Sequence, residues 1–244
     1  MTAQSKSRAI ENSRLLAVDD LEVQLVRKDI RTLRLAVRPP DGRVLVSAPH
    51  YLSEEYVCQA VLTKLRWIRK QQARLDARPL PLPSMMVTGE SHYLFDQCFT
   101  LELVERSGRH RVHIQDEHTL VLTVTPGTTP DKRVSVMNEW YRNRLKEQIP
   151  GLLAKWQPLI GREVMDWGIK RMKSRWGTCN VRAQRIWLNL ELARRPMVCL
   201  EYVLVHELVH LLERSHNQRF KSLMDGLLPE WRAHRALLNS MPII

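Results

Sequence analysis

The chain has 244 residues, of which 44% are hydrophobic and 26% are charged. This composition is typical of a soluble globular protein with one large or two small cores, and it excludes fibrous and disordered classes. No apolar run is long enough to cross a bilayer, and residues 1–14 lack the apolar core of a signal peptide. The sequence therefore predicts a cytoplasmic protein with no membrane contact.

Positive charge dominates the chain, which has a formal net charge of +12. Such a surface attracts polyanions and acidic ligands. Residues 162–185 carry seven Lys and Arg side chains against two acidic ones. This stretch is either a solvated basic face or a contact surface for phosphate or nucleic acid. The four cysteines form no CxxC pair, so we expect reduced thiols rather than a disulfide framework.

The first region, 1–78, is expected to form β-strands and a helix. Clustered β-forming residues predict strands at Leu21–Val26, Leu33–Val37 and Val44–Ala48. Ser53 begins a helical pattern that runs to about Ala77, with Trp67 and Ile68 on its apolar stripe. Three prolines between residues 78 and 84 exclude regular structure and predict a linker.

Two further regions, 79–130 and 131–244, follow the linker. The first is expected to be β-rich, with strands around Tyr93 and at 100–104, 111–114 and 120–124. The second is predicted to contain helices at 131–148, 151–159, 197–213 and 229–239, a strand at 163–170, and a strand pair at 174–176 and 186–190. There is no internal sequence repeat. The fold class expected is α+β.

The segment His206-Glu207-Leu208-Val209-His210 has the HExxH pattern. Residues four apart lie on one face of a helix, so both imidazoles can reach one metal ion, while Glu207 can hold a water molecule beside it. The surrounding helix is apolar on almost all sides, and burying two histidines and a carboxylate there is costly unless a metal compensates them. The alternative is a pair of structural histidines with ordinary hydrogen bonds.

A third metal ligand is expected downstream of the helix. His216 lies six residues beyond His210, and Ser215 and Asn217 on either side favour a turn that folds the chain back. The alternative ligands are the carboxylates of Asp225 and Glu230 from a later helix. Three protein ligands leave an open position on zinc, where bound water becomes acidic enough to attack.

The sequence resembles the YgjP-like metallopeptidase family, whose members are relatives of the SprT-type zinc proteases. The residues that carry the resemblance are Lys173–Cys179, Leu188–Asn189, Tyr202–His210, His216, Phe220 and Pro229. The resemblance implies a zincin-like catalytic half in a cytoplasmic protein, with one zinc ion per chain. It also implies that His206, His210 and His216 bind the zinc and that Glu207 is the catalytic base.

The chain departs from the family pattern at three places, none of which removes an essential atom. Thr178 stands where the family usually has Ser, a usual glycine is missing near Ala183-Gln184, and Ser215-His216-Asn217 replaces Asn-His-Ser. The absence of this glycine is expected to stiffen a turn between two strands.

The segment around Arg175-Trp176-Gly177 has two interpretations. In the structural one, Trp176 anchors the core and Gly177 meets a backbone requirement. In the functional one, an edge strand lines the cleft, and Arg175, Trp176 and Asn189 contact the substrate. Tyr202 is a further candidate for contact with the substrate, and Tyr202 and His234 are the candidate donors for stabilising the oxyanion.

Three functions remain open at the level of the sequence. The preferred one is a zinc-dependent hydrolase that cleaves peptide bonds in a peptide or protein. The second is a metal-dependent nucleotide (NTP) pyrophosphatase, whose arginines would grip phosphates. The third is a DNA-associated protease or binding protein, which the net charge would suit.

Overall fold

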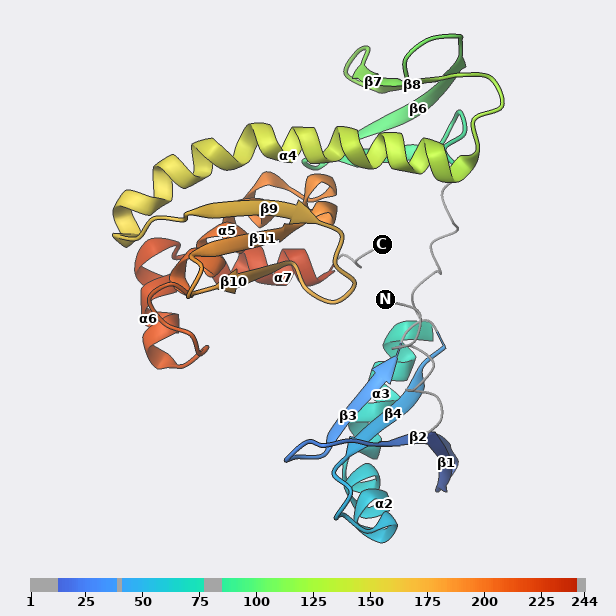
Figure 1. The fold of residues 1–244 in the computed structure, drawn as a ribbon, viewed down its shortest axis with the longest axis vertical. Helices are drawn as coiled ribbons and strands as arrows, with labels where there is room; N and C mark the ends of the chain where they lie inside the picture. The colour runs from blue at the N-terminus through green and yellow to red at the C-terminus, as the bar shows by residue number, and fades with distance from the viewer. Residues whose placement is uncertain (1–12, 39–40, 77–84, 241–244) are drawn as a thin grey trace. The chain divides into compact units, whose positions relative to one another are not determined.

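The computed structural model describes residues 13–38, 41–76 and 85–240. The chain divides into two compact units, Met1–Leu82 and Pro83–Ile244, which are coloured blue to teal and green to red in Figure 1. The predicted linker at 78–84 lies outside the described residues. The boundary expected at 130 lies within the second unit, because residues on both sides of it share one core.

The first unit is built on a four-stranded sheet. Its strands are β1 (Ser13–Val18), β2 (Leu21–Arg27), β3 (Arg34–Arg38) and β4 (Arg43–Ala48), in the order β1-β2-β4-β3. The central pair β2 and β4 is parallel, and both outer pairs are antiparallel. Alternate residues of these strands, such as Val23 and Val44, are buried in the core of this unit.

Two helices cover this sheet, α2 (Glu54–Thr63) and α3 (Leu65–Asp76), where the sequence predicted one. Ser53 caps α2 by accepting a hydrogen bond from the backbone N–H of Tyr56. The backbone leaves the helical conformation at Lys64, and Ile68 beyond the break still reaches the same core as α2. The expectation for Trp67 was wrong, because this side chain is 43% exposed.

The second unit begins with a sheet of the same topology. Its strands are β5 (Ser91–Leu94), β6 (Gln97–Glu105), β7 (Arg111–Ile114) and β8 (Thr119–Val124), in the order β5-β6-β8-β7. Here too the central pair is parallel and the outer pairs are antiparallel. The chain therefore repeats one arrangement of four strands, although its sequence shows no repeat.

Helix α4 (Pro130–Ile160) links this sheet to the C-terminal half of the unit (Figure 1). The sequence predicted a break at Pro150, but the helix is continuous and ends at Gly161 in the left-handed conformation. Proline removes one backbone donor and is costly inside a helix. Buried residues on both sides of it, including Ile149, Leu153 and Trp156, hold α4 against the core.

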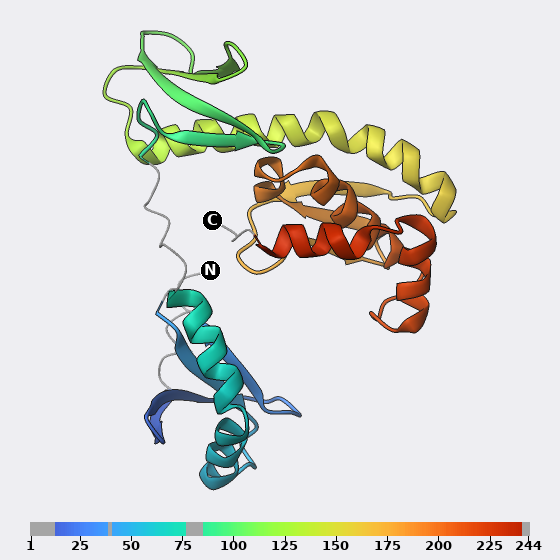
Figure 2. The same ribbon diagram turned by 180° about the vertical axis from the view of Figure 1, so that it is seen from behind.

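The C-terminal half combines a three-stranded sheet with four helical segments. Strands β9 (Asp166–Lys170), β10 (Gly177–Asn180) and β11 (Arg185–Asn189) have the order β10-β11-β9, so β10 is an edge strand. The 3₁₀ helix η1 (Leu190–Arg194) precedes α5 (Met197–Val209), α6 (Gln218–Leu227) and α7 (Trp231–Ser240). Helix α5 contacts β10, β11 and α7 (Figure 2).

The α+β class is confirmed, with three small sheets and six α-helices in the described residues. Strand β10 begins three residues later than the predicted strand at 174–176, and α6 lies in a segment to which the sequence assigned no helix. No helix in the described ranges has both the length and the apolar character needed to span a lipid bilayer.

Candidate metal centre

Helix α5 carries His206 in its last turn and ends with His210 as its C-cap residue. The helix is buried on nearly all sides because most of its residues are apolar. The imidazole rings of His206 and His210, one turn apart, have centroids 4.9 Å apart. The Nδ1 atom of His210 lies 3.0 Å from the carbonyl oxygen of Glu213, a contact that leaves Nε2 free to bind a metal.

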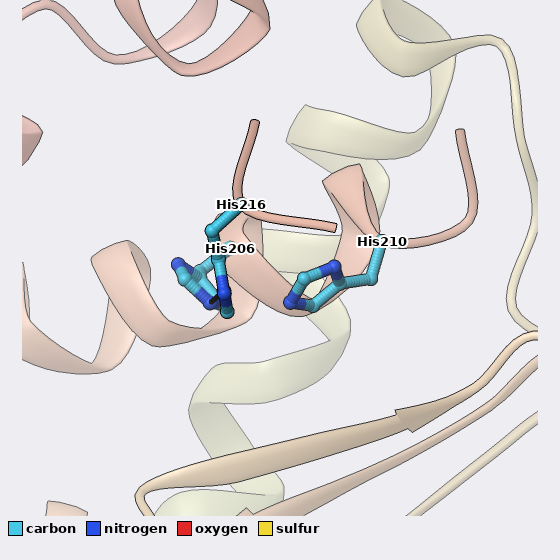
Figure 3. A group of neighbouring side chains, drawn as sticks. All are labelled: His206, His210 and His216. Atoms are coloured by element: carbon cyan, nitrogen blue, oxygen red, sulfur yellow. Dashed lines mark hydrogen bonds between the residues drawn. The ribbon is translucent and has the colours of Figure 1, made fainter. Parts of the chain in front are cut away.

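His216 returns to this pair from the loop between α5 and α6, as Figure 3 shows. Its ring centroid lies 4.9 Å from that of His206 and 4.7 Å from that of His210, and the Nε2 atoms of His216 and His206 are 2.9 Å apart. Asn217 begins α6 by accepting a hydrogen bond from the N–H of Phe220. The Phe220 ring packs beside all three imidazoles, at 4.8 to 4.9 Å between centroids.

The three histidines fit a single metal ion. One nitrogen of each ring lies within 4.8 Å of the others, and ligands around a tetrahedral zinc are roughly 3.3 Å apart. Burial lowers the pKa of His206 to about 3, with further lowering from His210, His216 and Arg235. Burial, His210 and Arg235 likewise lower the pKa of His216. Both rings are therefore neutral near pH 7, as metal ligands must be.

Neither alternative third ligand belongs to this cluster. The Asp225 carboxylate accepts a hydrogen bond from Nε1 of Trp231, at 2.8 Å, and pairs with Arg232. Glu230 lies 3.8 Å from Nε2 of His234. The structure therefore brings His216 to the pair on α5, and it leaves both carboxylates outside the group.

Glu207 is buried between α5 and the edge strand β10, with 5% of its surface exposed. A Cβ atom added to Gly177 would lie 2.6 Å from Oε1 of Glu207. Burial raises the pKa of the Glu207 carboxyl to about 8, while the positive charge of Arg175 opposes this rise. Glycine at position 177 is thus required for space and not for backbone conformation, which sequence reasoning missed because the contact depends on how β10 packs on α5.

A cavity of about 710 Å³ opens over the histidines. Three of the proposed substrate contacts, Arg175, Trp176 and Tyr202, line it together with Glu207. The Tyr202 ring lies 5.8 Å from that of His206 and stacks on Trp231 at 6.4 Å, and burial raises the pKa of its hydroxyl. His234 does not line this cavity.

Asn189, the fourth proposed contact, lies outside the cavity and is completely buried. Its Nδ2 donates hydrogen bonds to the carbonyl oxygens of Met172, at 2.9 Å, and Arg175, at 2.7 Å. Its Oδ1 accepts from the N–H of Glu191 at 3.2 Å. Asn189 therefore fixes the loop that leads into β10.

Comparison with known proteins shows the family of the chain. The YgjP-like metallopeptidase domain family matches residues 31–241, which is most of the chain. The chain belongs to the YgjP-like family. No curated protein and no solved structure matches it. Membership places this YgjP-like protein among metal-dependent hydrolases of the peptidase type.

Proposed function

We propose that this YgjP-like protein is a zinc-dependent peptidase that holds one zinc ion per chain through His206, His210 and His216. The observation that supports this most is the convergence of the three imidazoles, with ligand atoms within 4.8 Å of one another. Imidazole is a preferred ligand of zinc, and three protein ligands leave one coordination position open, which is typical of catalytic rather than structural zinc sites.

The chain's own residues supply the proton transfers. When bound, zinc would acidify a water molecule and polarise the carbonyl group of the substrate. The positive charge of a bound zinc ion would favour the ionised form of Glu207 against the raised pKa that burial gives it. The Glu207 carboxylate would then accept the proton of the attacking water and pass it to the leaving amine. Tyr202 would donate a hydrogen bond to the developing oxyanion, since its ring lies beside His206 and its raised pKa keeps the hydroxyl protonated.

Strand β10 offers a way to hold an extended peptide. It is the edge strand of its sheet, and Gly177, Thr178 and Cys179 on it line the cavity. An extended substrate can add to such an edge through main-chain hydrogen bonds. In this arrangement Arg175 and Trp176, at the entrance to β10, would contact side chains of the substrate.

The direct test is zinc content combined with peptide hydrolysis. Protein purified without a metal-binding tag should contain about one zinc per chain, and His210→Ala should lose it. Glu207→Gln should keep the zinc and fail to cleave casein-like peptides. A zinc-free but folded wild-type protein, or a Glu207→Gln variant with full activity, would contradict the proposal.

A phosphate ester is the second candidate substrate, because the guanidinium groups of Arg175, Arg214 and Arg235 line the cavity. Nucleoside triphosphates assayed beside the peptides distinguish the two chemistries. Salt-dependent binding to DNA would instead favour a protease that acts on DNA-associated proteins.

A further inference from the structure

The cavity over the histidines is strongly asymmetric in charge. Three arginines line it, namely Arg175, Arg214 and Arg235, and all three side chains are exposed. The only carboxylate among its described lining residues is Glu207, which is 5% exposed. A substrate that enters this cavity therefore meets three exposed cationic side chains and one buried carboxyl group.

The three arginines come from different elements that surround the histidines. Arg175 precedes β10, Arg214 lies in the loop between α5 and α6, and Arg235 lies on α7. Arg235 lines the same cavity as His206 and His216. The positive charge is thus placed beside the proposed reacting centre.

Among the described residues, no ion pair neutralises these three charges. In the described parts of the chain, none of the three arginines forms an ion pair of the kind that joins Arg232 to Asp225. A second hollow shares Arg235 with the first and adds Lys221 and Arg232, of which Arg232 is paired with Asp225. The cationic surface therefore continues from the histidines along α7.

We infer that the peptides bound in this cavity carry acidic side chains close to the scissile bond, held by Arg175, Arg214 and Arg235. This inference rests on the proposed peptidase function, whose substrate class it narrows. Guanidinium groups bind carboxylates through paired hydrogen bonds, and a cationic cleft raises the local concentration of acidic segments.

The same surface favours an acidic peptide over a nucleic acid. Binding of single strands relies on exposed aromatic rings on which bases stack. The aromatic rings Tyr202 and Trp231 are 6% and 5% exposed and stack on each other, and Trp176 is half-buried. An extended peptide, in contrast, can pair with the edge strand β10, which lies along the cavity.

The experiment measures binding separately from turnover. Three fluorescent peptides of equal length, with Glu, Gln or Lys at the positions flanking one central bond, are titrated into full-length Glu207→Gln protein loaded with zinc. The Glu peptide should bind at least about tenfold more tightly than the Lys peptide, with a dissociation constant that rises with salt. In an Arg214→Glu, Arg235→Glu double variant the order of affinities should invert, with the Lys peptide binding more tightly than the Glu peptide.

The control is an Arg111→Glu, Arg162→Glu double variant, which changes the net charge equally at exposed positions outside the cavity. It should retain the order of the parent, and circular dichroism checks that both double variants fold. Equal binding of the three peptides, or an unchanged order in the cavity variant, would overturn the inference. An oligothymidylate that binds more tightly than the Glu peptide would overturn it in favour of nucleic acid.

Cleavage of the same peptides by the unmodified protein tests the proposed function independently. If the Glu peptide binds selectively and no peptide is cleaved, the peptidase assignment fails while the preference for acidic ligands stands. If all three peptides are cleaved at equal kcat/KM and bind equally, the peptidase assignment stands and the preference fails.

Discussion

Gly177 packs directly against the Glu207 side chain: a methyl group on Gly177 would lie 2.6 Å from Oε1 and 2.8 Å from Cγ of Glu207. The neighbour is a buried carboxylate on α5, and the glycine belongs to the edge strand that lines the same cavity. The packing of β10 on α5 therefore controls where the proposed catalytic base lies.

Gly177→Ala should displace this carboxylate without removing a metal ligand. A displacement of about 1 Å in a reacting group can cost roughly 100-fold in rate, so kcat should fall by about that factor while zinc content stays near that of the parent. Steady-state kinetics and elemental analysis measure the two effects. Gly151→Ala on α4 is the control, since an added methyl group there meets nothing within 4 Å.

His216→Ala should weaken zinc binding by more than the ~10–100-fold typical of removing a group that only supports a ligand. The reason is that His216 supplies one of the three converging nitrogens. Competition with a fluorescent chelator measures the affinity. Asp225→Asn is the matched control, because this carboxylate lies outside the cluster; an equal loss of affinity there would point to a different ligand set.

Asn189→Ala should destabilise the second unit by about 1–3 kcal/mol, because it removes a fully buried amide and leaves the partly buried carbonyl groups of Met172 and Arg175 without their donor. Thermal unfolding measures this loss. Freeing the loop before β10 should also raise KM more than it lowers kcat, since the loop carries Arg175 and Trp176. Asn180→Ala removes an exposed hydrogen bond to the N–H of Ala183 and should have a small effect. An equal loss of thermal stability in both variants would argue against the proposal that Asn189 fixes the loop before β10.

The sequence predicted the parts of this fold that depend on local pattern. The family and the α+β class are confirmed, and the strand predicted at 111–114 coincides with β7. The continuity of α4 through Pro150 and the shared topology of the two four-stranded sheets were not predictable, because they depend on packing between distant segments. The sequence did not predict helix α6, because this helix is short and polar and has no apolar pattern long enough to indicate a helix.

The candidate site likewise has parts that the sequence predicts and parts that it does not. The HExxH spacing and the turn residues beside His216 indicate a metal site directly, and the metal-binding and catalytic roles of these residues stay predictions. Substrate-contact residues were harder to choose, since whether Asn189 faces a cavity or a buried loop depends on the register of β11. The contact between Gly177 and Glu207 needs the relative position of β10 and α5, which no local pattern contains.

Gln184 provides a test of the departure from the family pattern near the turn between β10 and β11. Its φ is 43°, in the left-handed region that disfavours residues with a side chain, and the family usually has a glycine near this position. Gln184→Gly should therefore stabilise the protein by about 1 kcal/mol, because glycine adopts this conformation without the steric cost of a Cβ atom. For a unit of this size the midpoint of thermal unfolding should rise by about 2–4 °C. Arg182→Gly in the same turn is the control, since its φ is not in that region, and it should be neutral or destabilising; a lower midpoint for Gln184→Gly would show that the turn is not strained.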